Sequence, residues 1–196
     1  MKFEDKQRIE AAIAAAPGVV KDVPEDVRHA AVAILLRGSS LAEAEILLMR
    51  RATREGDPWS GQIGLPGGHA EPVDADLIDT ARRESREEVG IDPGADGATL
   101  FGPLPIVQAS ARGKRVPLFT TPIVFHRRAT ETAELGPEAD EAFWLPVGRT
   151  LSGELDAPHR YEREGLVHKM PSWNFEGRTI WGMTYGILNR FLTAIK

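Results

Sequence analysis

The stretch GLPGGHAEPVDADLIDTARRESREEVGI, residues 64–91, places a loop with two consecutive glycines directly before a helix rich in carboxylates. With about 100° of rotation per residue, Glu84, Glu87 and Glu88 share one face of this helix, within an arc of roughly 100°. Like charges at positions i and i+4 cost roughly 0.2 to 0.5 kcal/mol, so the arrangement is a small local loss. Some other interaction is needed to offset that loss.

The helix is predicted to run from about Asp74 or Asp76 to Val89, and Gly90 signals its end. A separate stripe of the helix is suited to packing on a sheet, and it consists of Leu77, Ile78, Ala81 and Ser85. We therefore expect all three glutamates to point away from the core.

Two interpretations of the glutamate face remain open from the helix alone. The first is a solvated face neutralised by the neighbouring arginines, since charge-rich helices are common; these are Arg82, Arg83 and Arg86. The second is a hard divalent cation held by clustered oxygens, with Mg²⁺ the natural choice where phosphate is also present. Gly67 and Gly68 could form a simple tight turn, but they also allow a main-chain carbonyl to face a cation. Loop and helix together favour the cation.

Composition restricts the class of protein. The chain has 196 residues, of which 42% are hydrophobic, and this suits one compact domain with a real core. Its net charge of -5 gives no general electrostatic reason to bind nucleic acid or an anionic membrane. The absence of cysteine excludes disulfides and thiolate chemistry and fits a reducing compartment. The N-terminal residues lack the apolar run of a signal peptide. We expect a soluble cytoplasmic protein.

Apolar runs and breakers along the chain predict a mixed α and β order. A helix over residues 4–16, closed by Pro17 and Gly18, is predicted as an appended element, and a helix with one buried face closes the chain. Two central strands are predicted to pair, and further strands or hairpins follow; the segments are 29–37, 45–51, 99–107, 115–125, 141–147, 159–170 and 173–183. We expect residues 1–27 to form an N-terminal helix and linker and residues 28–196 the main domain.

The nine residues RESREEVGI, 83–91, resemble the Nudix box of the Nudix hydrolases. That box reads Arg-Glu, an aliphatic residue, any residue, Glu-Glu, any residue, Gly and an aliphatic residue. Ser85 takes a position that is normally aliphatic. The spacing from glycine to arginine is one residue longer than in the common box, so the expected upstream acid falls on Asp74, with Ala75 at the strict register. The resemblance implies the Nudix fold, an α+β architecture with a mixed β-sheet sandwiched between helices.

The longer spacing and the tail IWGMTYGILNRFL are similar to the coenzyme A diphosphatase branch of the family. The upstream signature of that branch is met only in part by residues 46–68, where Ala52, Trp59 and Leu65 depart from it. The resemblance implies coenzyme A or a derivative as substrate. One alternative is a nucleoside diphosphate sugar or ADP-ribose. A second alternative is a catalytically silent Nudix-fold regulator, against which the three intact glutamates argue.

The resemblance also implies the chemistry of the site. Nudix hydrolases cleave the diphosphate of a nucleoside-linked compound by water attack at phosphorus, and Mg²⁺, with Mn²⁺ as an option, reconciles an anionic substrate with an acidic site. Carried over by position, the implied metal ligands are Glu84, Glu87, Glu88 and the carbonyl of Gly67. Arg83 is expected to hold Glu87 or the loop, because Arg forms bidentate contacts with carboxylates.

The remaining site residues are less sharply indicated. The general base is expected among the acids that precede a predicted strand, and Glu141 is preferred to Glu138 and Asp140. Three arginines are candidates to meet substrate phosphates, although surface or ion-pair roles are the alternative; they are Arg28, Arg51 and Arg54. The predicted partner is a small nucleoside diphosphate derivative, and assembly as a homodimer stays open.

Overall fold

The computed structural model describes residues 1–15, 27–111, 114–128, 132–163 and 165–196. The helix stop predicted at Pro17 and Gly18, and most of the predicted linker, lie outside these residues. The N-terminal helix α1, Phe3–Ala15, buries Ile9 completely in the main hydrophobic core. The division into residues 1–27 and 28–196 stays a prediction.

The described residues form one eight-stranded sheet with the strand order β3-β2-β1-β7-β5. Strands β4, β6 and β8 pair with β1, β7 and β2 in turn. The strands are β1 Arg28–Arg37, β2 Glu45–Arg51, β3 Ile63–Gly64, β4 Gly67–His69, β5 Thr99–Pro103, β6 Val107–Ala111, β7 Lys114–Arg127 and β8 Ala139–Pro146. The sheet is mixed, because β1 runs parallel to β7 while its other pairings are antiparallel.

Strand β1 lies at the centre of the sheet and faces a core on both sides. Residues 30–36 are all buried, which explains their continuous apolar sequence. Val32, Ile34 and Leu36 join one hydrophobic cluster. The alternate residues Ala31, Ala33 and Leu35 join the other.

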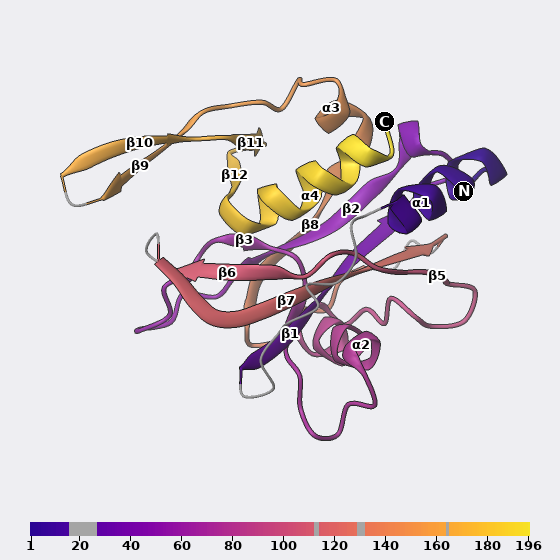
Figure 1. Ribbon diagram of the computed structural model, residues 1–196, viewed down its shortest axis with the longest axis horizontal. Coiled ribbons are helices and arrows are strands. Elements are labelled where there is room, and N and C mark those ends of the chain that lie inside the picture. The colour runs from indigo at the N-terminus through magenta and orange to yellow at the C-terminus, as the bar shows by residue number, and fades with distance from the viewer. Residues whose placement is uncertain (16–26, 112–113, 129–131, 164) are drawn as a thin grey trace.

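Helices cover both faces of the sheet (Figure 1). Helix α2, Leu77–Val89, packs on one face through Ala81 and Val89. Helix α1 and the C-terminal helix α4, Gly182–Ala194, cover the opposite face. The predicted buried face of α4 is confirmed, since its core side chains are Ile187, Leu188, Phe191 and Leu192. The expectation of a mixed sheet between helices is therefore confirmed.

Shorter elements complete the described chain. They are η1 Leu41–Glu43, α3 Val147–Leu151, and the hairpins β9 His159–Arg163 with β10 Leu166–Met170 and β11 Ser172–Phe175 with β12 Arg178–Trp181. The prediction of a single strand over residues 99–107 is wrong in its extent: β5 ends at Pro103 and β6 begins at Val107, and both pair with β7. No helix in the described residues is long and apolar enough to cross a membrane.

Both ends of α2 follow directly from its sequence. The carboxylate of Asp76 accepts hydrogen bonds from two first-turn amides at 2.8 and 2.9 Å, so Asp76 is the N-cap. Gly90 ends the helix in the left-handed region with φ of 71°. Beyond it, Asp92 accepts bonds from Arg82 and Arg86, and these bonds hold the chain against the last turn.

Ser85 lies at the centre of the packing stripe of α2. Its side chain is completely buried, and its hydroxyl has no hydrogen-bond partner among the described residues. A buried polar group without a partner costs free energy, because water satisfied it in the unfolded chain. The position therefore favours a small apolar side chain.

We expect Ser85→Ala to raise the free energy of unfolding by about 1 kcal/mol, since it removes an unpaired hydroxyl from the core. Urea unfolding followed by circular dichroism measures this. Thr80→Val is the matched control. The Thr80 hydroxyl donates to Asp74 at 2.9 Å, so its removal should lower the free energy of unfolding. A loss of stability in Ser85→Ala would contradict the assignment.

Candidate active site

The glycine loop is pressed against the central strand. Gly67 pairs with Val32 of β1, and its φ of 151° suits glycine alone. A Cβ atom at this position would lie 2.2 Å from the carbonyl oxygen of Ala31. The amide of Gly67 instead donates to the carboxylate of Glu88 at 2.8 Å. The loop and α2 are thus joined directly at a glutamate of the predicted site.

Gly68 makes room for a second glutamate. A Cβ atom on Gly68 would lie 2.5 Å from the carboxyl carbon of Glu84. The Glu84 carboxylate therefore rests against the loop backbone at this point. Only a residue without a side chain leaves this contact undisturbed.

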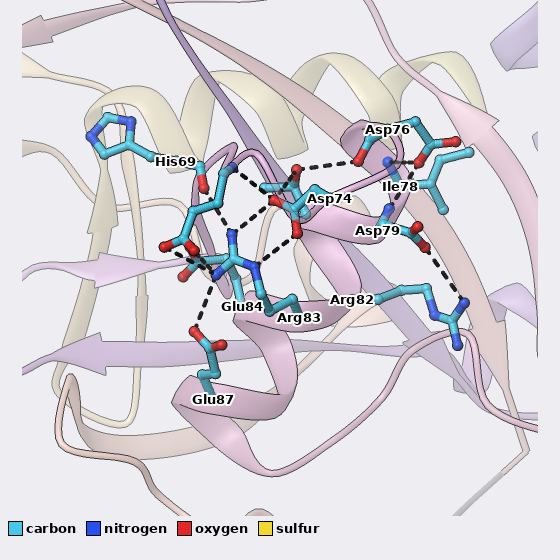
Figure 2. Close-up of polar contacts among 11 residues, drawn as sticks. His69, Asp74, Asp76, Ile78, Asp79, Arg82, Arg83, Glu84 and Glu87 are labelled. Atoms are coloured by element: carbon cyan, nitrogen blue, oxygen red, sulfur yellow. Dashed lines mark hydrogen bonds and ion pairs between the residues drawn. The ribbon is translucent and has the colours of Figure 1, made fainter.

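The guanidinium of Arg83 lies between the loop and the helix (Figure 2). Its Nε and Nη2 donate to the two carboxylate oxygens of Asp74 at 2.9 and 3.0 Å. Nη2 also donates to the carbonyl of His69 at 2.9 Å. Nη1 donates to Glu84 at 2.9 Å and to Glu87 at 3.2 Å. Arg83 thus contacts both the loop and Glu87, the two partners that the sequence suggested for it.

Asp74 is the buried counterion of this group. Its side chain is only 5% exposed and also accepts bonds from the Glu71 amide and the Thr80 hydroxyl. The hydrogen bonds from Arg83 hold the pKa of Asp74 well below its usual range. The structure therefore gives the upstream acid a definite contact, although Asp74 lies one residue from the strict register of the box.

Glu88 is buried, so the expectation that all three glutamates point away from the core is wrong for this residue. Its side chain is 2% exposed, because the glycine loop folds over the last turns of α2. Burial raises the pKa of Glu88 to about 8, and the charges of Glu84 and Glu138 add to this effect. The Gly67 amide and Arg51 oppose it. Among the described residues, Nη1 of Arg51 forms the ion pair of Glu88, at 3.8 Å.

The three glutamates occupy different environments. Burial raises the pKa of the half-buried Glu84, while Arg83 opposes the shift. Glu87 is 59% exposed and contacts Arg83. Among the described residues, no group of three acidic or histidine side chains could hold a metal ion as they stand. Glu84 and Glu88 nevertheless fit a hard divalent cation, since both are carboxylates whose negative charge is opposed by burial.

The three predicted phosphate-binding arginines differ in their partners. Arg51 contacts Asp57 at 3.1 Å and approaches Glu88. Arg54 forms an ion pair with Glu138 at 3.1 Å. Arg28 is exposed at the start of β1. The structure therefore brings Arg51 and Arg54 to acidic residues, whereas Arg28 lies at the first position of the central strand β1.

Glu141, the preferred general base, is already engaged by two arginines. Arg178 donates to it through Nε at 2.8 Å, and Arg50 does so at 3.2 Å. The hydrogen bonds from Arg178 lower the pKa of Glu141, which makes this carboxylate a poor proton acceptor. The charge of Glu138 instead acts on Glu84 and Glu88. Of the three candidate acids, Glu138 lies just before β8 and acts on the glutamate cluster, whereas the sequence favoured Glu141, which lies within β8.

Comparison with known proteins shows which family has this loop and glutamate-rich helix. The NUDIX domain family matches residues 27–166 of the chain. The chain belongs to the Nudix hydrolase family. It is 33% identical over 172 residues to an uncharacterized Nudix hydrolase, NudL, of Yersinia enterocolitica, covering 86% of this chain and 82% of that protein. NudL of Citrobacter koseri is 32% identical over 178 residues, covering 87% and 85%.

Solved structures share the fold. A MutT/nudix family protein from Enterococcus faecalis superimposes with a TM-score of 0.54 at 18% identity, covering 97% of this chain and 72% of that one. The bifunctional NMN adenylyltransferase/ADP ribose pyrophosphatase of Francisella tularensis, complexed with AMP and a manganese ion, gives 0.54 at 14% identity, covering 98% and 47%. This Nudix hydrolase is thus an enzyme of a family that cleaves diphosphate bonds in nucleoside diphosphate-linked compounds and uses divalent cations.

We expect Gly68→Ala to weaken Mn²⁺ binding roughly tenfold, because the new methyl group displaces the Glu84 carboxylate. Isothermal titration of the purified variant with Mn²⁺ measures the change. Gly64→Ala is the matched control, since a Cβ there meets nothing within 4 Å. Equal Mn²⁺ affinity in both variants would show that Glu84 does not bind the cation.

Proposed function

We propose that the chain is a Mg²⁺-dependent diphosphatase that acts on coenzyme A or a coenzyme A derivative. The observation that carries the proposal is the pair Glu84 and Glu88, two partly or fully buried carboxylates set against the loop of Gly67 and Gly68. The choice of coenzyme A is supported by the longer box spacing and by the C-terminal tail, both of which are similar to that branch.

In this proposal the chain's own residues hold the cation and orient the diphosphate of the substrate. Glu84 and Glu88 would bind the cation, with Glu87 and the Gly67 carbonyl as further ligands. When bound, Mg²⁺ supplies an activated water and neutralises the charge that develops on the diphosphate. Arg83 fixes Glu84 through the bond at 2.9 Å, and the Gly67 amide orients Glu88. Arg51 and Arg54, with Arg28 as a further candidate, would bind phosphate oxygens bidentately.

Two other functions compete with this one. Nucleoside diphosphate sugars or ADP-ribose stay alternatives, because the segment 52–65 departs from the coenzyme A signature. A silent Nudix-fold regulator is disfavoured, because simple nucleotide binding would not require the two covered carboxylates of Glu84 and Glu88 beside an anionic ligand. Cytoplasmic localisation, the lack of affinity for nucleic acid and assembly as a homodimer stay predictions from the sequence.

A substrate panel tests the proposed function. Purified protein is incubated with Mg²⁺ and coenzyme A, ADP-ribose, a nucleoside diphosphate sugar, a dinucleoside polyphosphate or a nucleoside triphosphate, and the products are identified by mass spectrometry. We expect coenzyme A to yield 3′,5′-ADP and phosphopantetheine. Turnover of ADP-ribose or the sugar alone would move the enzyme to the alternative class. Binding without turnover of any compound would favour the regulator.

Glu88→Gln should reduce turnover of the best substrate by about a hundredfold or more, since it removes a charged metal ligand. The fold should persist, because Gln keeps an oxygen for the Gly67 amide and removes a charge that burial penalises. Initial rates and thermal unfolding together measure the two effects. Glu10→Gln, an exposed glutamate on α1, is the matched control and should retain full activity. Normal turnover by Glu88→Gln would remove Glu88 from the site.

A further inference from the structure

An ion pair lies beside the glutamate cluster and joins two segments that are distant in sequence. Nη1 of Arg54 contacts Oε1 of Glu138 at 3.1 Å, and Nη2 donates to the carbonyl of Pro137 at 3.3 Å. The amide of Ala52 donates to the carbonyl of Glu138 at 2.9 Å. The segment after β2 is thereby fastened to the segment before β8.

The backbone near Glu138 is fixed to the end of α2. The amide of Gly136 donates to the carbonyl of Glu88 at 2.9 Å, and the amide of Glu134 donates to that of Val89 at 3.0 Å. A Cβ on Gly136 would lie 1.8 Å from the carbonyl oxygen of Glu87, so the two segments are in direct backbone contact. The main chain of Glu138 therefore has a set position relative to the box, while its side chain can still turn.

Glu138 lies beside the glutamate cluster. It follows Gly136 by two residues, and the amide of Gly136 donates to the carbonyl of Glu88 at 2.9 Å. Arg54 supplies the positive charge that Glu138 contacts. Removing Arg54 from this pair would leave a third carboxylate facing the same region.

The pair is weak enough for a substrate to break. The side chains of Arg54 and Glu138 are 46% and 45% exposed, and ion pairs this exposed contribute roughly 0 to 1 kcal/mol. A diphosphate carries more charge and accepts both guanidinium bonds at once. Glu141 differs, because two arginines hold it and the loss of one partner would not free it.

We propose that Arg54 and Glu138 form a latch that the diphosphate of the substrate opens. Arg54 moves to the phosphate oxygens, and the released carboxylate of Glu138 becomes the general base. The oxygen of the attacking water bonds to phosphorus, the bridging P–O bond breaks, and the leaving phosphate takes the electron pair. Glu138 accepts the proton of the water. The inference rests on the proposed function and deepens it, since substrate binding itself frees the base.

The latch makes a specific prediction for binding without metal. The affinity for α,β-methylene-ADP is measured by isothermal titration in EDTA for the wild type, Arg54→Gln, Glu138→Gln and the double variant. Glu138→Gln should bind about three- to fivefold more tightly, because Arg54 no longer has to leave a partner. Glu134→Gln removes the same charge from the same segment and gives the general electrostatic gain. In the Arg54→Gln background, the gain from Glu138→Gln should fall to that general value.

Turnover supplies the second half of the test. Glu138→Gln should lower kcat by about a hundredfold or more while it tightens binding, a combination that a merely structural residue would not give. Glu138→Asp keeps a carboxylate and should restore part of kcat. Additive binding effects, or an unchanged kcat in Glu138→Gln, would overturn the latch. If the wild type turns over its substrate but the binding effects are additive, the latch alone fails; if the wild type turns over nothing, the proposed function fails.

Discussion

The guanidinium of Arg83 is the contact on which the site depends. It binds Asp74 with two bonds and also reaches the His69 carbonyl, so it fixes the glycine loop to α2. Arg83 and Asp74 are 14% and 5% exposed, and breaking a pair buried to this degree leaves an uncompensated charge that costs about 3 to 5 kcal/mol. The loop therefore cannot drift away from Glu84 and Glu88 without a large loss of stability.

The positions of the acidic groups follow from this constraint. With the loop held down, Gly67 covers Glu88 and Gly68 leaves space for Glu84, while Glu87 stays at the surface. Burial then opposes the negative charge of the two covered glutamates, and a cation would relieve both. The helix tolerates its crowded carboxylates because each one has a different environment, which a helical projection alone does not distinguish.

Features set by local sequence could be predicted, and those set by distant contacts could not. The end of α2 at Gly90 and the central strands β1 and β2 follow from neighbouring residues. The burial of Glu88 depends on Gly67, 21 residues earlier in the chain, and the engagement of Glu141 depends on Arg178 of the hairpin β11–β12. The extra residue of the box lies before the N-cap, in a turn that the Asp74 amide closes by donating to the Glu71 carbonyl. Asp74 therefore still contacts Arg83.

The parallel pairing of β1 with β7 has a consequence for folding during synthesis on the ribosome. Arg28 lies opposite Leu118 and Arg37 opposite Arg127, so the strand made first must wait for one made about ninety residues later. At 5 to 20 residues per second, a ribosome needs roughly 5 to 20 s to supply that partner. During this interval one edge of the apolar strand β1 stays unpaired, and a chaperone that binds extended apolar segments could bind it there.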